Sequence, residues 1–267
     1  MDPRRTLLLT LFDLRHSVFK VKGLLFLLPF LLYWLAILQL LHDGGAEFVV
    51  SQQGMLISTL LLTPDVTRAL FIDNPAVLSM TLMLGLTTLP LFCMLAGCNQ
   101  LAADAGRNSF RFLLTRCTRS ELFVSRYLSA CLLVAVAMGL LIVAVTLMSL
   151  HIDQKPLLTT LTYAAWILAV LVIYALPLIA FMSIFSSMMS GTVGAFLSGS
   201  SVFFVLMMIS RWLDDDYPAL FYVLPNSLKA SLYDVYSPDI MLSLAAMLAY
   251  SVVYLSLGWL LFQRRSV

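Results

Sequence analysis

The run Asp214, Asp215 and Asp216 is the densest group of reactive side chains in the sequence. Adjacent carboxylates supply the oxygen ligands that a divalent cation prefers. The alternative interpretation is a solvated acidic loop beside a hydrophobic segment. We favour this interpretation because an aspartate-rich enzyme site needs a second, facing cluster.

The rest of the sequence contains no recognisable catalytic pattern. None of the four lysines follows the glycine-rich phosphate loop of an ATP-binding protein, so the chain cannot bind ATP in that manner. A metal site needs clustered ligands. The histidines are instead scattered: His16, His42 and His151. We therefore expect no catalytic residue, no bound cofactor and no metal in this chain.

The segment 99–126 is short and rich in arginine. Phe110, Leu113 and Leu114 form an apolar stripe at helical spacing, and arginines one turn apart occupy a polar face. Thr118 or Ser120 can start a second helix that carries Glu121 in its first turn. The pattern indicates a docking surface for a soluble partner. The alternative is an anchor at the lipid headgroups.

The elements that position these residues are hydrophobic helices. The chain has 267 residues, of which 61% are hydrophobic and 11% charged, and its mean hydropathy of +0.96 excludes a soluble globular fold. Stretches of about 20 apolar residues span a bilayer as helices. Six such stretches contain no Asp, Glu, Lys, Arg or His: 23–41, 76–97, 128–150, 161–185, 192–209 and 240–262. We predict an all-α, polytopic membrane protein with a single domain, 1–267.

The ends of the chain and the longer loops complete this prediction. Residues 1–22 mix leucines with basic side chains at roughly helical spacing, which predicts an interfacial helix before the first span. The N-terminus, the 98–127 segment and the C-terminus together hold 12 basic and 4 acidic residues, against 4 basic and 10 acidic on the other side. Because Lys and Arg accumulate in the cytoplasm, we expect both termini there.

The segment 104–126 resembles the cytoplasmic signature of ABC-2 type transporter permeases, the membrane subunits of ABC exporters. It has an acidic and basic pair, a small turn followed by Ser or Thr, two leucines, two spaced arginines and a cation at the mouth of the third span. The matching positions are Asp104, Arg107, Ser109, Leu113, Leu114, Arg116, Arg119, Glu121 and Arg126. The sequence departs from the signature at Asn108, Cys117 and Arg126, where the family has Gly, Pro and Lys.

This resemblance implies the six-helix architecture of type V exporters. It also implies two copies of a cytoplasmic ABC ATPase, which would bind ATP and Mg²⁺, and a second copy or paralogue of the permease. The segment 98–127 would be the coupling segment. That role falls on Asp104, Arg107, Arg111, Arg116, Arg119 and Glu121. The family's usual direction is export, and its usual location is the bacterial cytoplasmic (inner) membrane.

The substrate path in similar permeases lies between the two copies. Here it would be lined by Phe26, Phe30, Tyr33, Thr87 and Thr88. This lining suits an amphipathic, lipid-like or peptide substrate. Membrane lipid is the other expected partner, and nucleic acid is not expected.

Two features concern the last two spans. Small residues four apart indicate a helix packing or dimer face. They are Gly194, Ala195, Ser198 and Gly199. In similar permeases, the region before the sixth span partly re-enters the membrane. Here that region is 211–239.

Two other functions stay open. A non-transporting assembly or scaffold subunit would share this topology, and a secondary carrier would need no ATPase.

Overall fold

The computed structural model describes residues 3–18, 21–61, 63–106, 115, 117–153, 155–212, 222–233 and 239–265. These residues form helices and turns, with no strand among them. Six of the helices are long and apolar enough to cross a membrane. They are α2 (Val21–Leu40), α6 (Ala76–Gly97), α9 (Arg119–Ile152), α10 (Leu157–Met188), α11 (Thr192–Trp212) and α13 (Ile240–Arg264).

All six predicted spans are confirmed as helices, and α6 has the predicted bounds. Helix α9 begins at Arg119, ahead of the predicted span at Leu128, because the helix expected to start at Thr118 or Ser120 runs directly into that span. Thr118 is the N-cap of this helix, as its sequence allows, so one continuous helix includes both the polar turns and the third span. The predicted N-terminal helix is α1 (Pro3–Val18).

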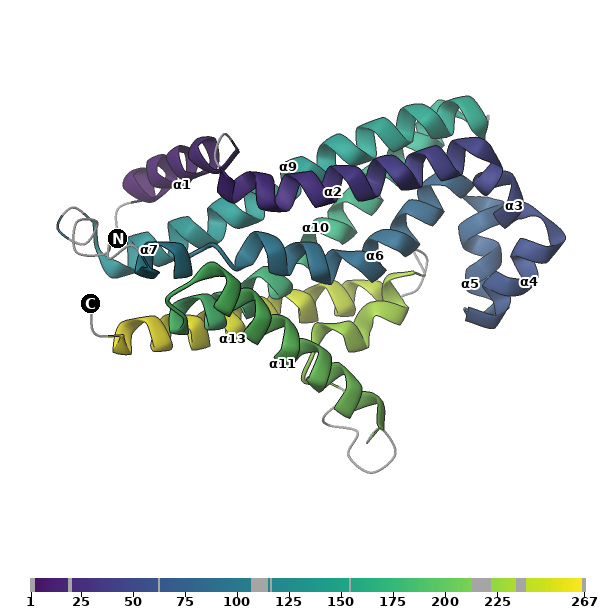
Figure 1. Ribbon diagram of the computed structural model, residues 1–267. Helices are drawn as coiled ribbons and strands as arrows, with labels where there is room; N and C mark the ends of the chain where they lie inside the picture. The colour runs from purple at the N-terminus through teal and green to yellow at the C-terminus, as the bar shows by residue number, and fades with distance from the viewer. Residues whose placement is uncertain are drawn as a thin grey trace.

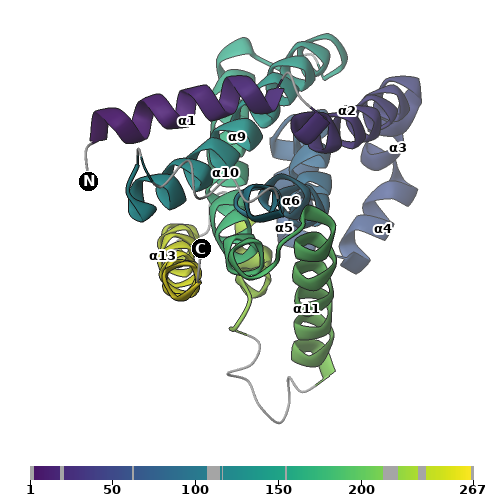
Figure 2. The same cartoon turned by 60° about the vertical axis from the view of Figure 1, so that its left-hand side comes forward.

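Helix α10 lies at the centre of the bundle and contacts α6, α9, α11 and α13 (Figures 1 and 2). Its sequence is hydrophobic on every side, which is typical of a helix surrounded by others. Ile167, Leu171 and Ile179 are fully buried. Helix α11 slants away from the other long helices, and most of its apolar side chains are exposed (Figure 1).

Both ends of the described chain lie at one end of the bundle, which we call the terminal end; the opposite one is the distal end (Figure 1). Helix α1 crosses α9 at the terminal end, where a short helix, α7 (Ala102–Gly106), follows α6. The distal end carries two π-helical turns and three short helices. These are η1 (Leu41–Gly45), α3 (Ala46–Val50), α4 (Gln52–Leu61), α5 (Pro64–Arg68) and η2 (Ala69–Asp73).

The chain reverses sharply between α2 and α3. Gly44 has a φ of 109°, a conformation that residues with a side chain rarely adopt. This glycine lets the distal helices fold back against α6. The apolar segment before Pro64 is thus a separate short helix, α4, of 10 residues, which is too short to span a bilayer.

Another short helix, η3 (Pro225–Leu232), packs against α10 and α13. The hydroxyl of Tyr254 donates to the carbonyl of Val223 at 2.6 Å. Tyr254 lies about 21 Å along the α13 axis from Ile240, at about 1.5 Å per residue. The chain before η3 therefore reaches well into the bundle from the distal end. A re-entrant position in the membrane stays a prediction.

Candidate functional site

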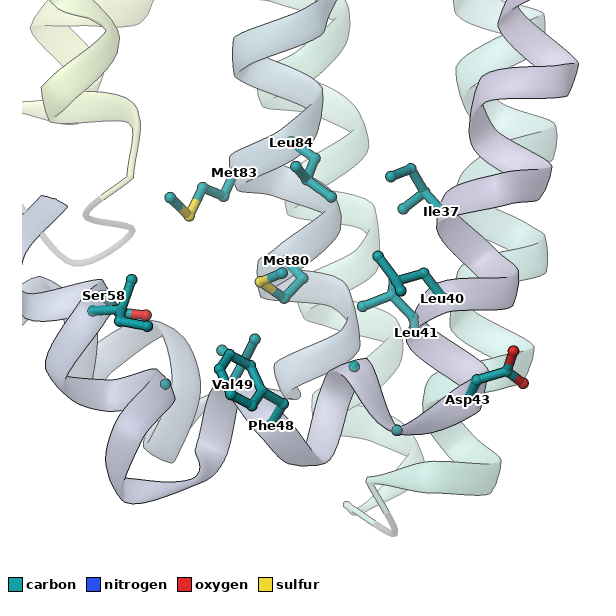
Figure 3. A pocket seen from close by; sticks show the side chains of 14 residues that line it. Ile37, Leu40, Leu41, Asp43, Phe48, Val49, Ser58, Met80, Met83 and Leu84 are labelled. Atoms are coloured by element: carbon teal, nitrogen blue, oxygen red, sulfur yellow. The ribbon is translucent and has the colours of Figure 1, made fainter.

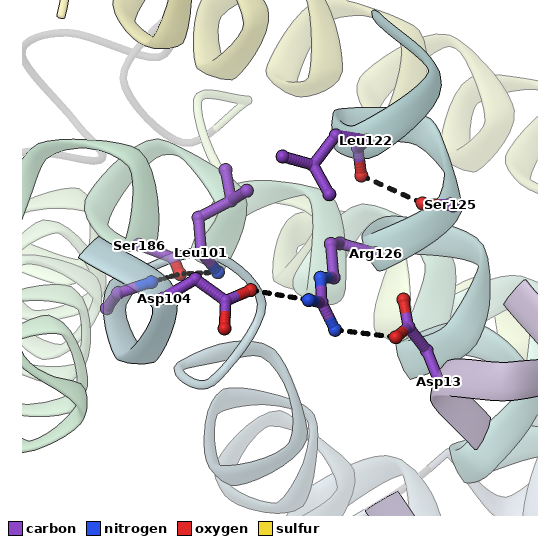
Figure 4. Close-up of polar contacts among 8 residues, drawn as sticks. Asp13, Leu101, Asp104, Leu122, Ser125, Arg126 and Ser186 are labelled. Atoms are coloured by element: carbon purple, nitrogen blue, oxygen red, sulfur yellow. Dashed lines mark hydrogen bonds and ion pairs between the residues drawn. The ribbon is translucent and has the colours of Figure 1, made fainter. Parts of the chain in front are cut away.

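The candidate site is a set of contacts that fasten the 98–127 segment to the bundle at the terminal end. Arg126 of α9 forms two ion pairs: its Nη1 lies 2.8 Å from Oδ1 of Asp13, and its Nη2 lies 2.6 Å from Oδ2 of Asp104. Figure 4 shows the guanidinium lying between the two carboxylates. The planar fork of arginine makes such two-sided pairing possible. One side chain thus joins α1, α7 and α9.

These three charges are shielded from solvent. The side chains of Asp13, Asp104 and Arg126 are 10%, 9% and 18% exposed. Charges at such depth are screened little by salt, and each depends on its partners to offset its lost hydration. The geometry of the Asp13–Arg126–Asp104 triad is therefore held tightly.

Helix α1 presents a polar stripe to the bundle. Thr6, Thr10 and Asp13 follow one another at helical spacing and are buried, whereas Leu7, Leu11 and other apolar side chains point outward. The hydroxyl of Thr10 donates to the carbonyl of Thr6, so this stripe carries few unsatisfied groups. An outward apolar face suits contact with lipid, and the inward stripe places Asp13 beside Arg126.

The turn after α6 is fastened to α10. Oγ of Ser186 accepts from the backbone N–H groups of Leu101 and Ala102 at 2.8 and 3.0 Å, and its O–H donates to the carbonyl of Cys98 at 3.3 Å (Figure 4). The side-chain amide of Gln100 donates to the carbonyl of Ile179. These contacts satisfy the first N–H groups of α7, which a helix start otherwise leaves unpaired.

The start of α9 is capped and tied to α13. Thr118 and Glu121 form a capping box, in which each side chain accepts from the other's backbone N–H, at 3.3 and 3.0 Å. Arg119 donates to the carbonyls of Gln263 and Arg265 at 2.9 and 3.2 Å. The first turn of α9 is therefore linked to the end of α13.

Arg265 extends these links to α10. Its guanidinium donates to the carbonyls of Ser187 and Met189 at 2.7 and 3.1 Å. Burial lowers the pKa of the Arg265 guanidinium, which still stays protonated because arginine is not deprotonated in proteins.

The structure divides the predicted coupling residues into two groups. Asp104 and Glu121 are buried and bonded within the chain, and Arg119 is bonded to the end of α13. These three position the segment. The others lie outside the described residues: Arg107, Arg111 and Arg116. A docking role for the segment stays a prediction. The Asp214, Asp215 and Asp216 run also lies outside the described residues.

Sequence reasoning missed two members of this site. Asp13 lies far from Arg126 in the sequence, and its only signal was the polar spacing of Thr6, Thr10 and Asp13. Ser186 has no such signal in the sequence, whereas in the structure it lies near the end of α10 and accepts from the first N–H groups of α7.

The predicted substrate-path residues lie in two places. Phe26 and Phe30 are buried where α2 faces α6, and the Phe30 ring lies edge-on against Phe92 at 5.2 Å. Tyr33 packs on the same Phe92 ring at 5.5 Å. On α6, Thr88 is partly buried, and its hydroxyl donates to a carbonyl of its own helix.

Thr87 is exposed and contacts η3. Its hydroxyl donates to the carbonyl of Met83 and accepts from Nζ of Lys229, both at 2.9 Å. The aromatic residues and Thr87 therefore do not form one surface within this chain. A path between two copies stays a prediction.

The small residues of α11 also separate into two faces. Ala195 and Gly199 are buried, and a Cβ at Gly199 would lie 2.5 Å from Sδ of Met182 and 3.3 Å from the Phe185 ring. Gly194 is exposed and Ser198 partly so. Ala195 and Gly199 thus let α11 approach α10 of the same chain. A dimer face on α11 stays a prediction.

Comparison with known proteins places the chain in one family. No curated protein matches the sequence. Residues 66–267 match the family described as "protein of unknown function (DUF2705)", and the match includes five of the six long helices. Because this match covers more than half of the sequence, the chain belongs to the DUF2705 family.

Proposed function

We propose that this protein is the membrane-spanning permease subunit of an ABC exporter, powered by a separate cytoplasmic ATPase. Its substrate would be amphipathic, lipid-like or a peptide. The terminal end, which carries most of the basic residues, would face the cytoplasm.

The observation that carries this proposal is the anchoring of the 98–127 segment. Its two described ends are bonded to α1 through Asp13, to α10 through Ser186 and to α13 through Arg119. A force applied to this segment would therefore move several spanning helices together. A coupling element needs this mechanical property, and a lipid anchor does not.

The energy for transport would come from contacts that differ between two states. An ATPase that binds the segment more tightly in one conformation of the permease favours that conformation, and ATP hydrolysis resets the preference. The sequence fits this division of labour, because it lacks a phosphate-binding loop of its own.

The test is affinity purification of the full chain from its native membrane in mild detergent. We expect a stoichiometric ATPase subunit to co-purify, identified by mass, and the eluate to hydrolyse ATP. An intact preparation without an ATPase would contradict the proposal. Transport by the purified chain alone would then favour a secondary carrier, and no transport would favour a scaffold subunit.

A charge reversal separates the docking role from folding. Replacing Arg107 and Arg111 together by Glu should abolish retention of the ATPase while the protein still inserts and purifies. The matched control replaces Arg4 and Arg5 by Glu, the same change of charge at the same end but outside the segment. Equal retention in both variants would remove the docking role from the segment.

A further inference from the structure

One lysine lies at a depth where lysine is rare. Lys229 belongs to η3, and its Nζ donates to the hydroxyl of Thr87 at 2.9 Å. Thr87 is about 16 Å along the α6 axis from Ala76, at about 1.5 Å per residue, near the middle of that helix. The hydrocarbon core of a bilayer is about 30 Å thick. The ammonium group therefore lies level with the middle of the α6 span.

The contacts of Lys229 within the described residues are a hydroxyl and an aromatic ring. Its side chain is partly buried, and Nζ lies 5.7 Å from the centre of the Tyr233 ring. Within the described part of the chain, no carboxylate forms an ion pair with it. A hydroxyl and an aromatic ring hold an ammonium group in place but do not neutralise its charge.

Such a group is costly, and a cation at this depth marks a path for ions or substrates. The positive charge of Lys229 also favours a ligand of negative charge. A partly dehydrated ammonium attracts an anion, and a phosphate or carboxylate would form the strong, charge-assisted hydrogen bonds that Thr87 cannot supply.

An apolar cavity begins one helical turn from Thr87, the residue whose hydroxyl accepts from Lys229. The carbonyl of Met83 accepts from the same Thr87 hydroxyl, and the Met83 side chain lines a cavity of about 490 Å³. The cavity lies between α2, α6 and the distal helices α3 and α4. Figure 3 shows Ile37 and Leu41 facing Met80 and Leu84 across it.

The lining of this cavity suits a hydrocarbon chain. Apart from Asp43, which is exposed, and Ser58, its side chains are aliphatic, aromatic or thioether groups. Mostly apolar walls with a few polar groups are typical of sites for small ligands. Here the polar group at the Met83 end is the Lys229–Thr87 pair.

We infer that Lys229 and Thr87 bind the anionic group of an amphipathic substrate whose hydrocarbon chain lies in the cavity lined by Met80, Met83 and Leu84. That this ligand is a transported substrate rests on the proposed function. The site itself is a property of this chain alone, so its test uses no ATPase.

The experiment measures binding of hexadecyl phosphate to the purified full-length protein in a nonionic detergent, by native mass spectrometry. We expect wild type to bind this anion more tightly than hexadecanol. Lys229→Gln should weaken hexadecyl phosphate binding at least about tenfold and leave hexadecanol unchanged, because only the charge-assisted bonds are lost. Lys229→Arg should restore most of the affinity.

The matched control is Lys155→Gln, which removes the same charge from a lysine elsewhere in the bundle, whose Nζ donates to the carbonyl of Ile72 at 2.9 Å. It should not change binding. Equal losses in Lys155→Gln and Lys229→Gln would reduce the effect to general surface charge and overturn the site. Equal binding of hexadecyl phosphate and hexadecanol by wild type would also overturn it.

A second variant tests the cavity without altering the cation. Ser58→Phe adds a ring at the cavity wall and should weaken hexadecyl phosphate but not octyl phosphate, whose chain is shorter. Unchanged hexadecyl phosphate binding in a folded Ser58→Phe protein would exclude the cavity. A stoichiometric phospholipid that hexadecyl phosphate cannot displace would identify a resident lipid and overturn the substrate assignment.

The two proposals can fail separately. Selective anion binding without a co-purifying ATPase would keep the site and reject the ABC permease. A co-purifying ATPase with binding unaffected by Lys229→Gln would keep the permease and reject the site.

Discussion

Arg126 carries more of the terminal-end structure than any other described side chain, because it alone joins α1, α7 and α9. Its positive charge offsets the negative charges of Asp13 and Asp104. The guanidinium is flanked by two buried carboxylates, which would repel each other without it. Removing it is therefore worse than removing either carboxylate.

We predict that Arg126→Gln destabilises the protein by about 3–5 kcal/mol, the usual cost of leaving a buried charge unpaired. The melting temperature in detergent measures this. Adding Asp104→Asn to Arg126→Gln should restore part of the loss, since one carboxylate then no longer needs a cation. An Arg126→Gln protein that melts like wild type would show that the triad contributes nothing.

The Thr118 cap gives a smaller and more local effect. Thr118→Ala removes the acceptor for the N–H of Glu121 and should cost about 1 kcal/mol. Hydrogen exchange would locate the change, with faster exchange in the first turn of α9 and none at its far end. Thr118→Ser keeps the hydroxyl and should exchange like wild type; if it exchanges like Thr118→Ala, the capping box is not the cause.

At the scale of elements, the spacing between long helices is set by a few small residues. A Cβ at Gly97 of α6 would lie 2.7 Å from the Met182 Cβ of α10, a rigid contact close to the backbone. Gly139 of α9 is the opposite case, with nothing within 4 Å of its Cβ position.

The two glycines form a matched pair. Gly97→Ala should destabilise the protein by about 1–3 kcal/mol, because α6 and α10 must move apart. Gly139→Ala should be neutral or stabilising by up to about 1 kcal/mol, since alanine favours a helix. Thermal melts of both variants in the same detergent test this. A larger loss in Gly139→Ala would contradict the packing of α6 on α10.

The spans could be predicted because the bilayer imposes a length and excludes charge, and both constraints are local in sequence. The start of α9 could be predicted because Thr118 and Glu121 are three residues apart. The depth of η3 could be predicted only in outline. Its own sequence, with Asn226, Ser227 and Lys229, is that of a solvated loop. Tyr254 and Thr87, far away in the sequence, hold this segment inside the bundle.

In the candidate site, too, features local in the sequence could be predicted and contacts between distant residues could not. Asp104 and Arg126 were recognised because a motif contains both, whereas Asp13 became visible only when α1 was placed against α9. The depth of Lys229 was missed for a related reason. Each predicted span lacks charge, and the cation reaches the interior from a segment that no hydropathy window would select.

For the whole molecule, the two ends of the bundle differ in how they are held together. The terminal end is closely bonded, through Arg126, Ser186, Arg119 and Arg265. The distal end holds the cavity and the turn at Gly44. A transporter of the proposed kind needs this asymmetry, because the end that receives force must be rigid and the end that releases substrate must open.

The last prediction concerns the side of the membrane that each end faces. The terminal-end segments hold 12 basic and 4 acidic residues, so these segments should remain in the cytoplasm. Alkaline phosphatase, which is active only outside the cytoplasm, should be inactive when fused after Arg265 and active when fused after Asp153, at the distal end of α9. Green fluorescent protein fusions at the same positions should give the opposite pattern. Active phosphatase after Arg265 would place the 98–127 segment outside the cytoplasm, where no ATPase could bind it, and the cavity would then open toward the cytoplasm.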